Sequence, residues 1–415
     1  MGIVFEPFAL DNLLTLRELS TRMLPRWILP EYIDDVLPNE AKRVEYLRRQ
    51  LLDLFATQGF ELVGPPTIEY LESLLTGSGK DLDLQTFKTI DRLSGRTLGF
   101  RADITPQISR IDSHLIGSDN VVRLCYCDKV LRTSPTEVDS PREVIQLGAE
   151  LFGFDGIEGD IEICRLMLKS LQVSGVVNPI LDIGNVAILR ALLRKINCSD
   201  EQKVELANLV QRKSQSELSD LLKNVSKSDR DMVLSLTELF GDRSVLSEAR
   251  KLLARAPEAI SGVERLEAIY DVISDLGCAI SFDLAEPHGY DYHSGVVFTA
   301  YAQGQNTPLG HGGRYDDIGS AFDRARPATG FTLNLRKLAQ LTPSVEMVGN
   351  KKCVYAPSNF DDKELQRIVE DLRSKGVVVI TDLIGDGTIK EERSFTDELI
   401  LVDGEWSLKP VIKST

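Results

Sequence analysis

The strongest constraint on the fold is a long helical segment that interrupts a series of predicted β-strands. Residues 185–277 are almost wholly helical in pattern, with many charged residues and no motif. The stretches NPILDIG before this segment and CAISFDLAEP after it are both typical of strands. We therefore expect a helical insertion, at about residues 185–277, inside one larger domain.

The strands outside the insertion predict an antiparallel sheet. Before it, VVRLCYC, KVLRTS and REVIQLGAELFG read as consecutive strands, and TFKTI and RTLGF read as a hairpin around the turn DRLSG. After it, SGVVFTAYAQ and TPLGHGGRYD read as strands, and residues 330–341 are expected to form a helix. Helices set against an antiparallel sheet place this domain in the α+β class.

A long amphipathic helix is expected early in the chain. Residues 39–58 include Leu47 and Leu51 at helical spacing, Asn39 can act as the N-cap, and Gly59 is a typical stop. A shorter helix is expected in TIEYLESLLT. These helices would cover the sheet.

The length of 415 residues allows two or three domains. We expect residues 1–22 to be a loosely held N-terminal arm, or a start placed too far upstream, and we assign them no function. Residues 23–342 would form the α+β core. Residues 345–415 alternate strand and helix patterns (KKCVYAP, DKELQRIVEDLRSKG, VVVITD), which predicts a separate small α/β unit.

The composition argues against membrane and nucleic-acid partners. No apolar run approaches the roughly 20 residues of a membrane span, and the N-terminal stretch lacks the features of a signal peptide, so we expect a cytoplasmic protein. The net charge of −15, from 63 acidic and 48 basic residues, gives phosphate groups little to bind. Six cysteines lack the paired spacing of a zinc ribbon or disulfide scaffold, and we expect buried thiols.

Two of the four histidines lie in the stretch HGYDYHSG, at positions 288 and 293. On a strand, side chains five residues apart face opposite ways, and a metal site would require a third ligand, so no metal is expected. A second interpretation is that both histidines pack in the sheet without binding any ligand. The glycines of GHGG lack the Lys-Ser/Thr of a phosphate-binding loop, which favours tight strand packing.

Four segments resemble, in order, the catalytic core of class II aminoacyl-tRNA synthetases, and specifically histidyl-tRNA synthetase. LPEYIDDVLPNEAKR, with the helix after it, is similar to the dimer-forming motif 1, and FRADITPQISR is similar to the family's Leu-Arg-Pro-Glu-Gly-Thr segment. Residues 132–150 resemble the motif 2 hairpin. HGYDYHSGVVF, GHGGRYDD and ATGFTLNLRKL resemble the histidine-specific element, the Gly-Gly-Arg-Tyr-Asp strand and motif 3. The resemblance covers about three quarters of the chain and implies a class II synthetase-like antiparallel sheet flanked by helices.

The resemblance implies that the amino-acid pocket is largely kept. Free histidine needs an anion for its α-amino group and polar partners for its imidazole, because a buried polar group without a partner is costly. The positions that match the family's histidine-binding residues are Asp103, Thr105, Gln146, Glu150, Tyr292 and His293. Asp103 stands where the family has Glu, and His293 where it has Tyr. Asp103 also precedes a Thr-Pro helix start, so a capping role stays open for it.

The resemblance also implies that the adenylation chemistry is lost. Joining a carboxylate to ATP requires preorganised positive charge. His288 replaces the family's arginine, and an ordinary histidine with a pKa of about 6.5 is mostly neutral at pH 7. Ser134 lies where motif 2 has a glutamate, and Lys337 where motif 3 has an arginine. Together with Arg132, which motif 2 keeps but which could be a surface charge, these residues would be a vestigial phosphate site, and no residue of this chain is expected to be catalytic.

A synthetase-like core with this loss and a short C-terminal unit resembles the family of regulatory subunits of ATP phosphoribosyltransferase. Residues 345–415 hold 14 acidic and 10 basic side chains, unlike a tRNA-binding domain. The resemblance implies a short-form catalytic subunit as partner, a homodimer through the motif 1-like region, L-histidine as feedback effector and no cofactor. The alternatives are a divergent but active histidyl-tRNA synthetase and a synthetase-like binding protein with another partner.

Overall fold

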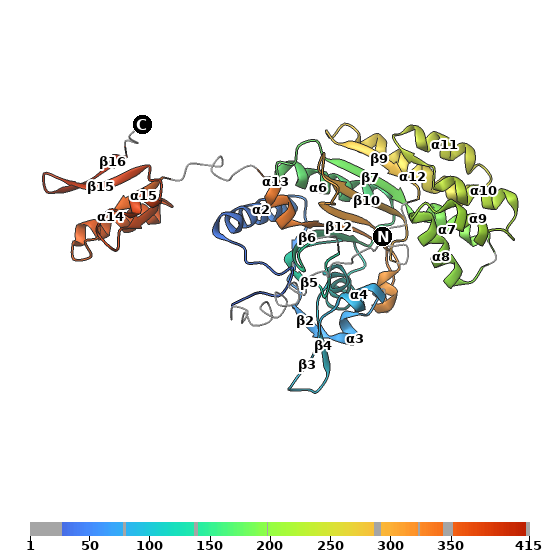
Figure 1. The fold of residues 1–415 in the computed structure, drawn as a ribbon, viewed down its shortest axis with the longest axis horizontal. Helices are drawn as coiled ribbons and strands as arrows, with labels where there is room; N and C mark the ends of the chain where they lie inside the picture. Colours follow the sequence, from blue (N-terminus) through green and yellow to red (C-terminus); the bar gives the residue numbers. More distant parts are fainter. Residues whose placement is uncertain are drawn as a thin grey trace, which may run out of the picture. The chain divides into compact units, whose positions relative to one another are not determined.

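The computed structural model describes residues 27–77, 80–136, 140–196, 198–285, 292–322, 324–342 and 352–411. Contacts divide the chain into two compact units, residues 1–342 and 343–415, which are treated separately below (Figure 1). The expected arm at residues 1–22 lies outside the described residues. Among the described residues, none of the helices is both long and apolar enough to span a membrane.

The first unit is built on a nine-stranded sheet with the strand order β1-β5-β6-β12-β11-β10-β7-β9-β8. Neighbouring strands are antiparallel except for the pairs β1–β5 and β7–β9, which are parallel, so the predicted antiparallel sheet is confirmed with two exceptions. The strands are β1 Glu61–Leu62, β5 Val122–Leu131, β6 Glu143–Phe152, β7 Ile180–Asn185, β8 Phe240–Gly241, β9 Ala279–Asp283, β10 Val296–Tyr301, β11 Gly310–Arg314 and β12 Ala328–Asn334.

Two sequence-based boundaries in the large sheet were wrong. Residues 122–131, which include most of VVRLCYC and the first three residues of KVLRTS, form one continuous strand, β5, because no glycine or proline interrupts them and ten residues pair with β6. Residues 330–334, expected to be helical, belong to strand β12, and helix α13 occupies only Leu335–Leu341. The side chain of Asn334 accepts a hydrogen bond from the backbone N–H of Lys337, which caps the helix at that point.

Helix α2 (Pro38–Thr57) confirms the predicted amphipathic helix. It buries Val44, Leu47, Leu51 and Phe55 against α6 (Ile157–Val173), α13 and the sheet. The N-cap is Leu37 with Pro38 as the first helical residue, so Asn39 is not the cap. Gly59 follows the helix with a φ of +81°, as a glycine stop should.

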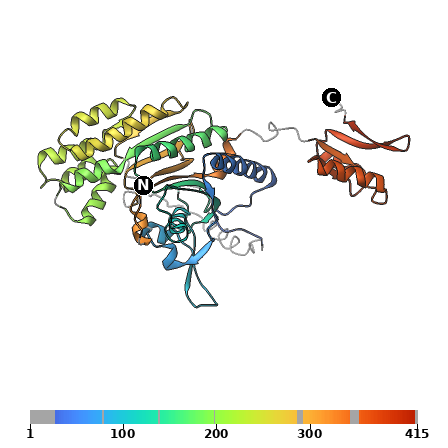
Figure 2. The same ribbon diagram turned by 180° about the vertical axis from the view of Figure 1, so that it is seen from behind.

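The insertion is helical, as expected, and also contributes the short edge strand β8. Helix α12 packs against α7, α6 and β7, which ties the insertion to the core, and Figures 1 and 2 show the insertion helices gathered beside one end of the sheet. The helices are α7 Val186–Arg194, α8 Asp200–Gln211, α9 Gln215–Leu221, α10 Lys227–Leu236, α11 Ser244–Leu252 and α12 Pro257–Ile273.

A small sheet with the order β2-β4-β3 projects from the other side of the unit, where Figure 1 shows it as a long hairpin. Strands β3 (Lys88–Ile90) and β4 (Thr97–Phe100) confirm the predicted hairpin. The stretch TIEYLESLLT is only partly helical, because its first residues form β2 (Ile68–Tyr70) and only Leu71–Leu74 form helix α3. Helix α4 (Lys80–Gln85) leads into the hairpin, and α5 (Thr105–Arg110) follows it, beside the large sheet.

The second unit is a four-stranded sheet in the order β14-β13-β15-β16, with α14 packed on it. The central strand β13 is parallel to both neighbours, which confirms the alternation of strand and helix expected here. Val354, Leu365, Val369 and Leu399 form its core. The elements are β13 Cys353–Ala356, α14 Lys363–Ser374, β14 Val378–Thr381, α15 Ile389–Glu392, β15 Asp397–Val402 and β16 Glu405–Pro410.

Candidate ligand-binding site

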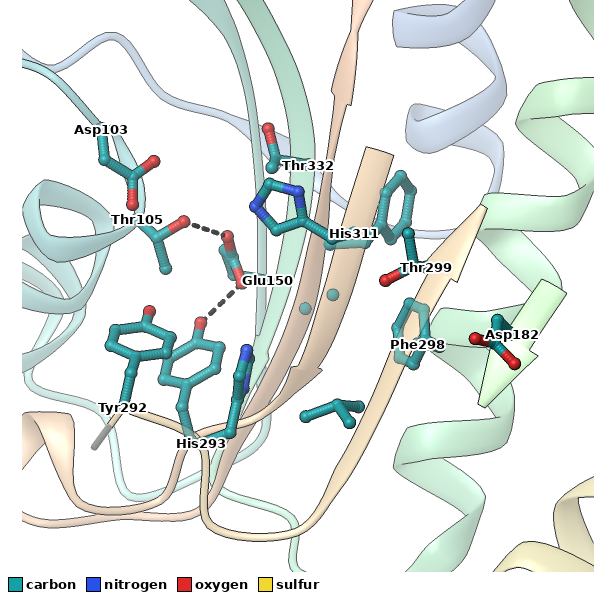
Figure 3. Close-up of a pocket in the computed structure, with 15 residues that line it drawn as sticks. Asp103, Thr105, Glu150, Asp182, Tyr292, His293, Phe298, Thr299, His311 and Thr332 are labelled. Carbon is teal, nitrogen blue, oxygen red and sulfur yellow. Dashed lines mark hydrogen bonds between the residues drawn. The ribbon is translucent and has the colours of Figure 1, made fainter. Parts of the chain in front are cut away.

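One pocket lies on a face of the large sheet, over strands β6, β7, β10, β11 and β12, beside the start of α5 (Figure 3). Five of the six residues that the sequence predicts to bind histidine line it: Asp103, Thr105, Glu150, Tyr292 and His293. They come from three separate segments of the chain, which the fold brings together.

The sixth residue, Gln146, does not line the pocket. It is buried on β6, on the same strand face as Glu150, and its side-chain oxygen accepts a hydrogen bond of 3.1 Å from the backbone N–H of Ile104. The carboxylate of Asp103 accepts from the same N–H at 2.8 Å. Gln146 thus holds the backbone that presents Asp103, and Asp103 combines a place in the pocket with a backbone contact just before α5.

Glu150 is the most deeply buried ionisable group of the pocket. Its carboxylate accepts hydrogen bonds from the hydroxyls of Tyr315 at 2.6 Å, Thr105 at 3.1 Å and Tyr126 at 3.2 Å. Burial raises the pKa of Glu150 to about 8, although the three hydroxyl donors favour the ionised form. A side chain at Gly330, directly across the strand pair, would collide with this carboxylate, which explains the glycine.

The cross-strand register extends the pocket along the sheet through residues that sequence reasoning missed. Thr332 on β12 is paired with His311 on β11, His311 with Thr299 on β10, and Thr299 with Asp182 on β7. All four line the pocket, and Asp182 also accepts a hydrogen bond from Ser281. We call Thr332, His311, Thr299 and Asp182 the polar row.

A second set of paired residues runs beside the polar row, starting at Glu150. From β12 to β7 its members are Gly330, Gly313, Val297 and Gly184. Gly330 and Gly313 leave room for neighbouring side chains, because the carboxylate of Glu150 lies over Gly330 and the ring of His293 lies over Gly313. The glycines thus let these two pocket residues lie close to the sheet.

Aromatic rings form one wall of the pocket. The ring of Tyr292 stacks on Tyr315 with 5.2 Å between centroids, and His293 meets Tyr292 edge-on at 5.0 Å. Burial raises the pKa of Tyr292 well above its ordinary value. The Nδ1 atom of His293 lies 3.2 Å from the carbonyl oxygen of Arg314. Figure 3 shows Tyr292 and His293 on the same side of Glu150.

A buried ion pair lies next to this wall, because Arg314 directly precedes Tyr315. The guanidinium of Arg314 lies 2.9 Å from the carboxylate of Asp160 on α6, and both side chains are almost completely buried. Arg265 of α12 also contacts Asp160, at 2.8 Å. The pair therefore ties the end of β11 to the helices behind the sheet.

Of the four residues predicted to be a vestigial phosphate site, the three that the structure describes do not line the pocket. Arg132 donates hydrogen bonds to the carbonyl oxygen of Ala102 and to Thr136, Ser134 is exposed, and the ammonium of Lys337 donates to the carbonyl oxygen of Pro308. None of these three lines the pocket. His288 lies outside the described residues. In the part of the chain that the structure describes, no group of three or more His, Cys, Asp or Glu could hold a metal ion.

Two family models match the chain. Residues 32–338 match the model described as "Histidyl-tRNA synthetase", and residues 351–409 match the model described as "ATP phosphoribosyltransferase subunit HisZ C-terminal domain". The core and the small unit thus match separate models.

Curated relatives and solved structures agree with this division. The chain is 47% identical to the ATP phosphoribosyltransferase regulatory subunit of Methylobacillus flagellatus, over 92% of this chain and 97% of that protein. It is 43% identical to the same-named protein of Nitrosospira multiformis, over 92% and 98%.

Among solved structures, it resembles "an ATP phosphoribosyltransferase regulatory subunit/histidyl-tRNA synthetase from Bacillus halodurans", with a TM-score of 0.78 and 28% identity over 90% of this chain and 97% of that one. Histidyl-tRNA synthetase from Nostoc shares the fold, with a TM-score of 0.73 and 18% identity over 93% and 95%. Identity above 40% along nearly the whole chain, with both units matched, shows that the chain belongs to the family of ATP phosphoribosyltransferase regulatory subunits.

Proposed function

We propose that this chain is the non-catalytic regulatory subunit of ATP phosphoribosyltransferase, serving the first step of histidine biosynthesis, and that its pocket binds L-histidine as a feedback effector. The catalysis would take place in a short-form catalytic subunit with which this chain assembles. The observation that carries the proposal is the charge of the pocket. Acidic side chains from three segments line it, Asp103, Asp182 and the largely protonated Glu150, and among the described lining residues there is no lysine or arginine.

This charge pattern supports an amino acid as ligand. An α-ammonium group needs an anion in a partly desolvated site, and Asp103 supplies one at the pocket wall. An imidazole ring needs flat apolar contacts and polar partners, which Tyr292 and Glu150 offer on adjacent sides. We therefore assign Asp103, Thr105, Glu150, Tyr292 and His293 to histidine binding, with Gln146 holding Asp103 in place.

The same pattern argues against ATP activation in this pocket. A triphosphate requires guanidinium or ammonium groups where charge develops, and losing one such group typically costs about 3–4 kcal/mol. Arg132 and Lys337 do not line the pocket and donate hydrogen bonds to the backbone carbonyls of Ala102 and Pro308, and Arg336, next to Lys337, donates to Glu40 at 2.7 Å. We infer that Arg132, Ser134, Lys337 and His288 no longer serve adenylation.

A bound histidine can regulate the partner only if it favours one quaternary state over another. A coupling free energy of about 1–3 kcal/mol would change activity roughly 5- to 150-fold. The pocket lies over five strands of one sheet, so a ligand that draws Glu150 and the polar row together would act on several elements at once. The ligand would then change the activity of the partner without any chemistry in this chain.

We also propose that the chain dimerises through its motif 1-like region. The segment just before α2 exposes a run of apolar side chains, among them Trp27 at 82% exposure, Ile28, Leu29 and Leu37. Apolar groups gathered on one exposed segment favour a protein–protein contact. The acidic chain gives no reason to expect a nucleic-acid partner, and a membrane partner and a location outside the cytoplasm are not expected either.

Two assays on the purified chain test this function. Calorimetric titration with L-histidine should show binding that Asp103→Ala weakens strongly. Pyrophosphate exchange with histidine and ATP should stay at background, with an active histidyl-tRNA synthetase as the positive control. Histidine-dependent exchange would instead identify a working synthetase, and absence of histidine binding to the chain and its complex would refute the effector role.

A further inference from the structure

We propose that His311 binds the α-carboxylate of the amino-acid ligand, and so determines that the pocket accepts a free amino acid. The inference rests on the proposed function, because it concerns the ligand of the same pocket. It assigns a role to the polar row, which contains none of the residues that the sequence predicts to bind histidine.

The charges around the pocket require such a residue. Asp103 and Asp182 contribute carboxylates, and Glu150, whose pKa burial raises to about 8, adds a third acidic group, so a ligand carboxylate placed among them needs a hydrogen-bond donor that can carry positive charge. Among the described lining residues, only His293 and His311 have such a side chain. Within the part of the chain that the structure describes, the choice is therefore between these two imidazoles.

His293 is already part of the aromatic wall. Its Nδ1 atom faces the carbonyl oxygen of Arg314 at 3.2 Å, and its ring meets Tyr292 edge-on. The ring lies directly over Gly313, where a Cβ atom would come within 2.9 Å of Nδ1. These contacts place His293 beside the site proposed for the ligand's imidazole, next to Tyr292 and Glu150.

His311 lies two residues before Gly313 on β11, and therefore on the same face of the sheet. It is exposed on β11, and Figure 3 shows its ring extending from that strand toward Thr105 and Glu150. Strand β11 is two strands away from β6, so their backbones are separated by about 10 Å. The side chains of Glu150 and His311 both extend into the space between these strands. The remaining distance between the two side chains fits a ligand that contacts Glu150 at one end and His311 at the other.

The neighbours of His311 suit a carboxylate as well. Thr332 and Thr299 are its cross-strand partners on the two adjacent strands, and both line the pocket. A carboxylate has two oxygens, and a hydroxyl can donate to the second while an imidazole N–H donates to the first.

The test compares L-histidine with L-histidinol, which has a hydroxymethyl group in place of the carboxylate. Both ligands are titrated calorimetrically into the full chain, into His311→Ala and into His311→Gln. His114→Ala, a histidine outside the pocket, is the matched control, and thermal unfolding checks that each variant is folded. His311→Ala should weaken L-histidine by about 10- to 100-fold, the usual effect of losing a hydrogen bond to a charged group, and should change L-histidinol by less than about twofold.

The amide of His311→Gln keeps a donor without charge, so this variant should retain part of the preference for L-histidine. Equal weakening of both ligands by His311→Ala, or unchanged L-histidine affinity, would overturn the role of His311 while leaving histidine binding intact. A wild-type chain that binds neither ligand would instead refute the proposed effector role, and this inference with it.

Discussion

The hydroxyl of Tyr315 donates a hydrogen bond of 2.6 Å to the carboxylate of Glu150, and both side chains are almost completely buried. Tyr315 follows β11, whereas Glu150 lies on β6, and β12 separates the two strands. The bond therefore joins the aromatic wall of the pocket to its buried acid. It holds the Glu150 side chain at the point where the ligand's ring is proposed to lie.

Tyr315→Phe should weaken this arrangement with little change in shape. Removing the donor favours the protonated form of Glu150, so the pKa of Glu150 should rise further. The free energy of unfolding should fall by about 1–2 kcal/mol, measured by urea denaturation. Tyr292→Phe is the matched control, because the buried Tyr292 hydroxyl lies near Thr105 but makes no hydrogen bond of normal geometry with a described residue. Equal losses in the two variants would contradict a special role for the Tyr315 bond.

The pKa of Glu150 predicts how stability depends on pH. Burial raises it from 4.5 to about 8, so between these values the folded chain keeps a proton that the unfolded chain has released. Stability must then fall as pH rises through this window, and the contribution is fully present below pH 4.5. Urea unfolding at several pH values measures this dependence. As pH rises, the free energy of unfolding should fall less steeply for Glu150→Gln than for the wild type, because the glutamine side chain is neutral throughout. A variant with the same slope as the wild type would assign the dependence to other groups.

The buried pair of Arg314 and Asp160 should be important for stability. Asp160→Ala leaves the buried guanidinium of Arg314 with the carboxylate of Asp316 at 3.2 Å as its remaining ion-pair partner, so it should lower the free energy of unfolding by about 3 kcal/mol. Glu45→Ala removes the exposed pair between Arg49 and Glu45 and should cost less than about 1 kcal/mol. Chemical denaturation of both variants makes the comparison. Similar small losses would mean that the Asp160 site relaxes or admits water.

The exposed segment before α2 predicts a change in oligomeric state. Replacing Trp27 and Leu29 together by alanine should shift the chain from dimer toward monomer in sedimentation velocity, because the contact loses its largest apolar side chains. Phe360→Ala is the control, since Phe360 is similarly exposed but belongs to the second unit. An unchanged dimer would move the proposed interface elsewhere.

Regular patterns in the sequence predicted much of the fold. Leu47 and Leu51 lie on one face of α2, as their spacing indicated, and Gly59 ends the helix. The boundary between β12 and α13 was misplaced, because GFTLN contains residues common to strands and helices, and only the capping contact of Asn334 marks the change.

The site was harder to predict because it depends on register. The family resemblance assigned Thr105 and Glu150 to the same pocket, and in the structure the hydroxyl of Thr105 lies 3.1 Å from the carboxylate of Glu150. Asp182, Thr299 and His311 lie far apart in the sequence, and only the order β11-β10-β7 places them side by side. GHGG was correctly interpreted as tight packing, since a side chain at Gly312 would strike the backbone of Gly330. The same interpretation hid His311, whose side chain lies on the open face.

The measurement that tests the account most directly is the rate of the reconstituted ATP phosphoribosyltransferase as a function of L-histidine concentration. The short catalytic subunit is combined with the wild-type chain or with Glu150→Ala, and assembly is followed by size-exclusion chromatography. We predict that both chains assemble and support the reaction, and that Glu150→Ala raises the histidine concentration needed for inhibition by about tenfold or more. Inhibition that is unchanged by Glu150→Ala, or lost only in proportion to assembly, would contradict a regulatory histidine site in this pocket.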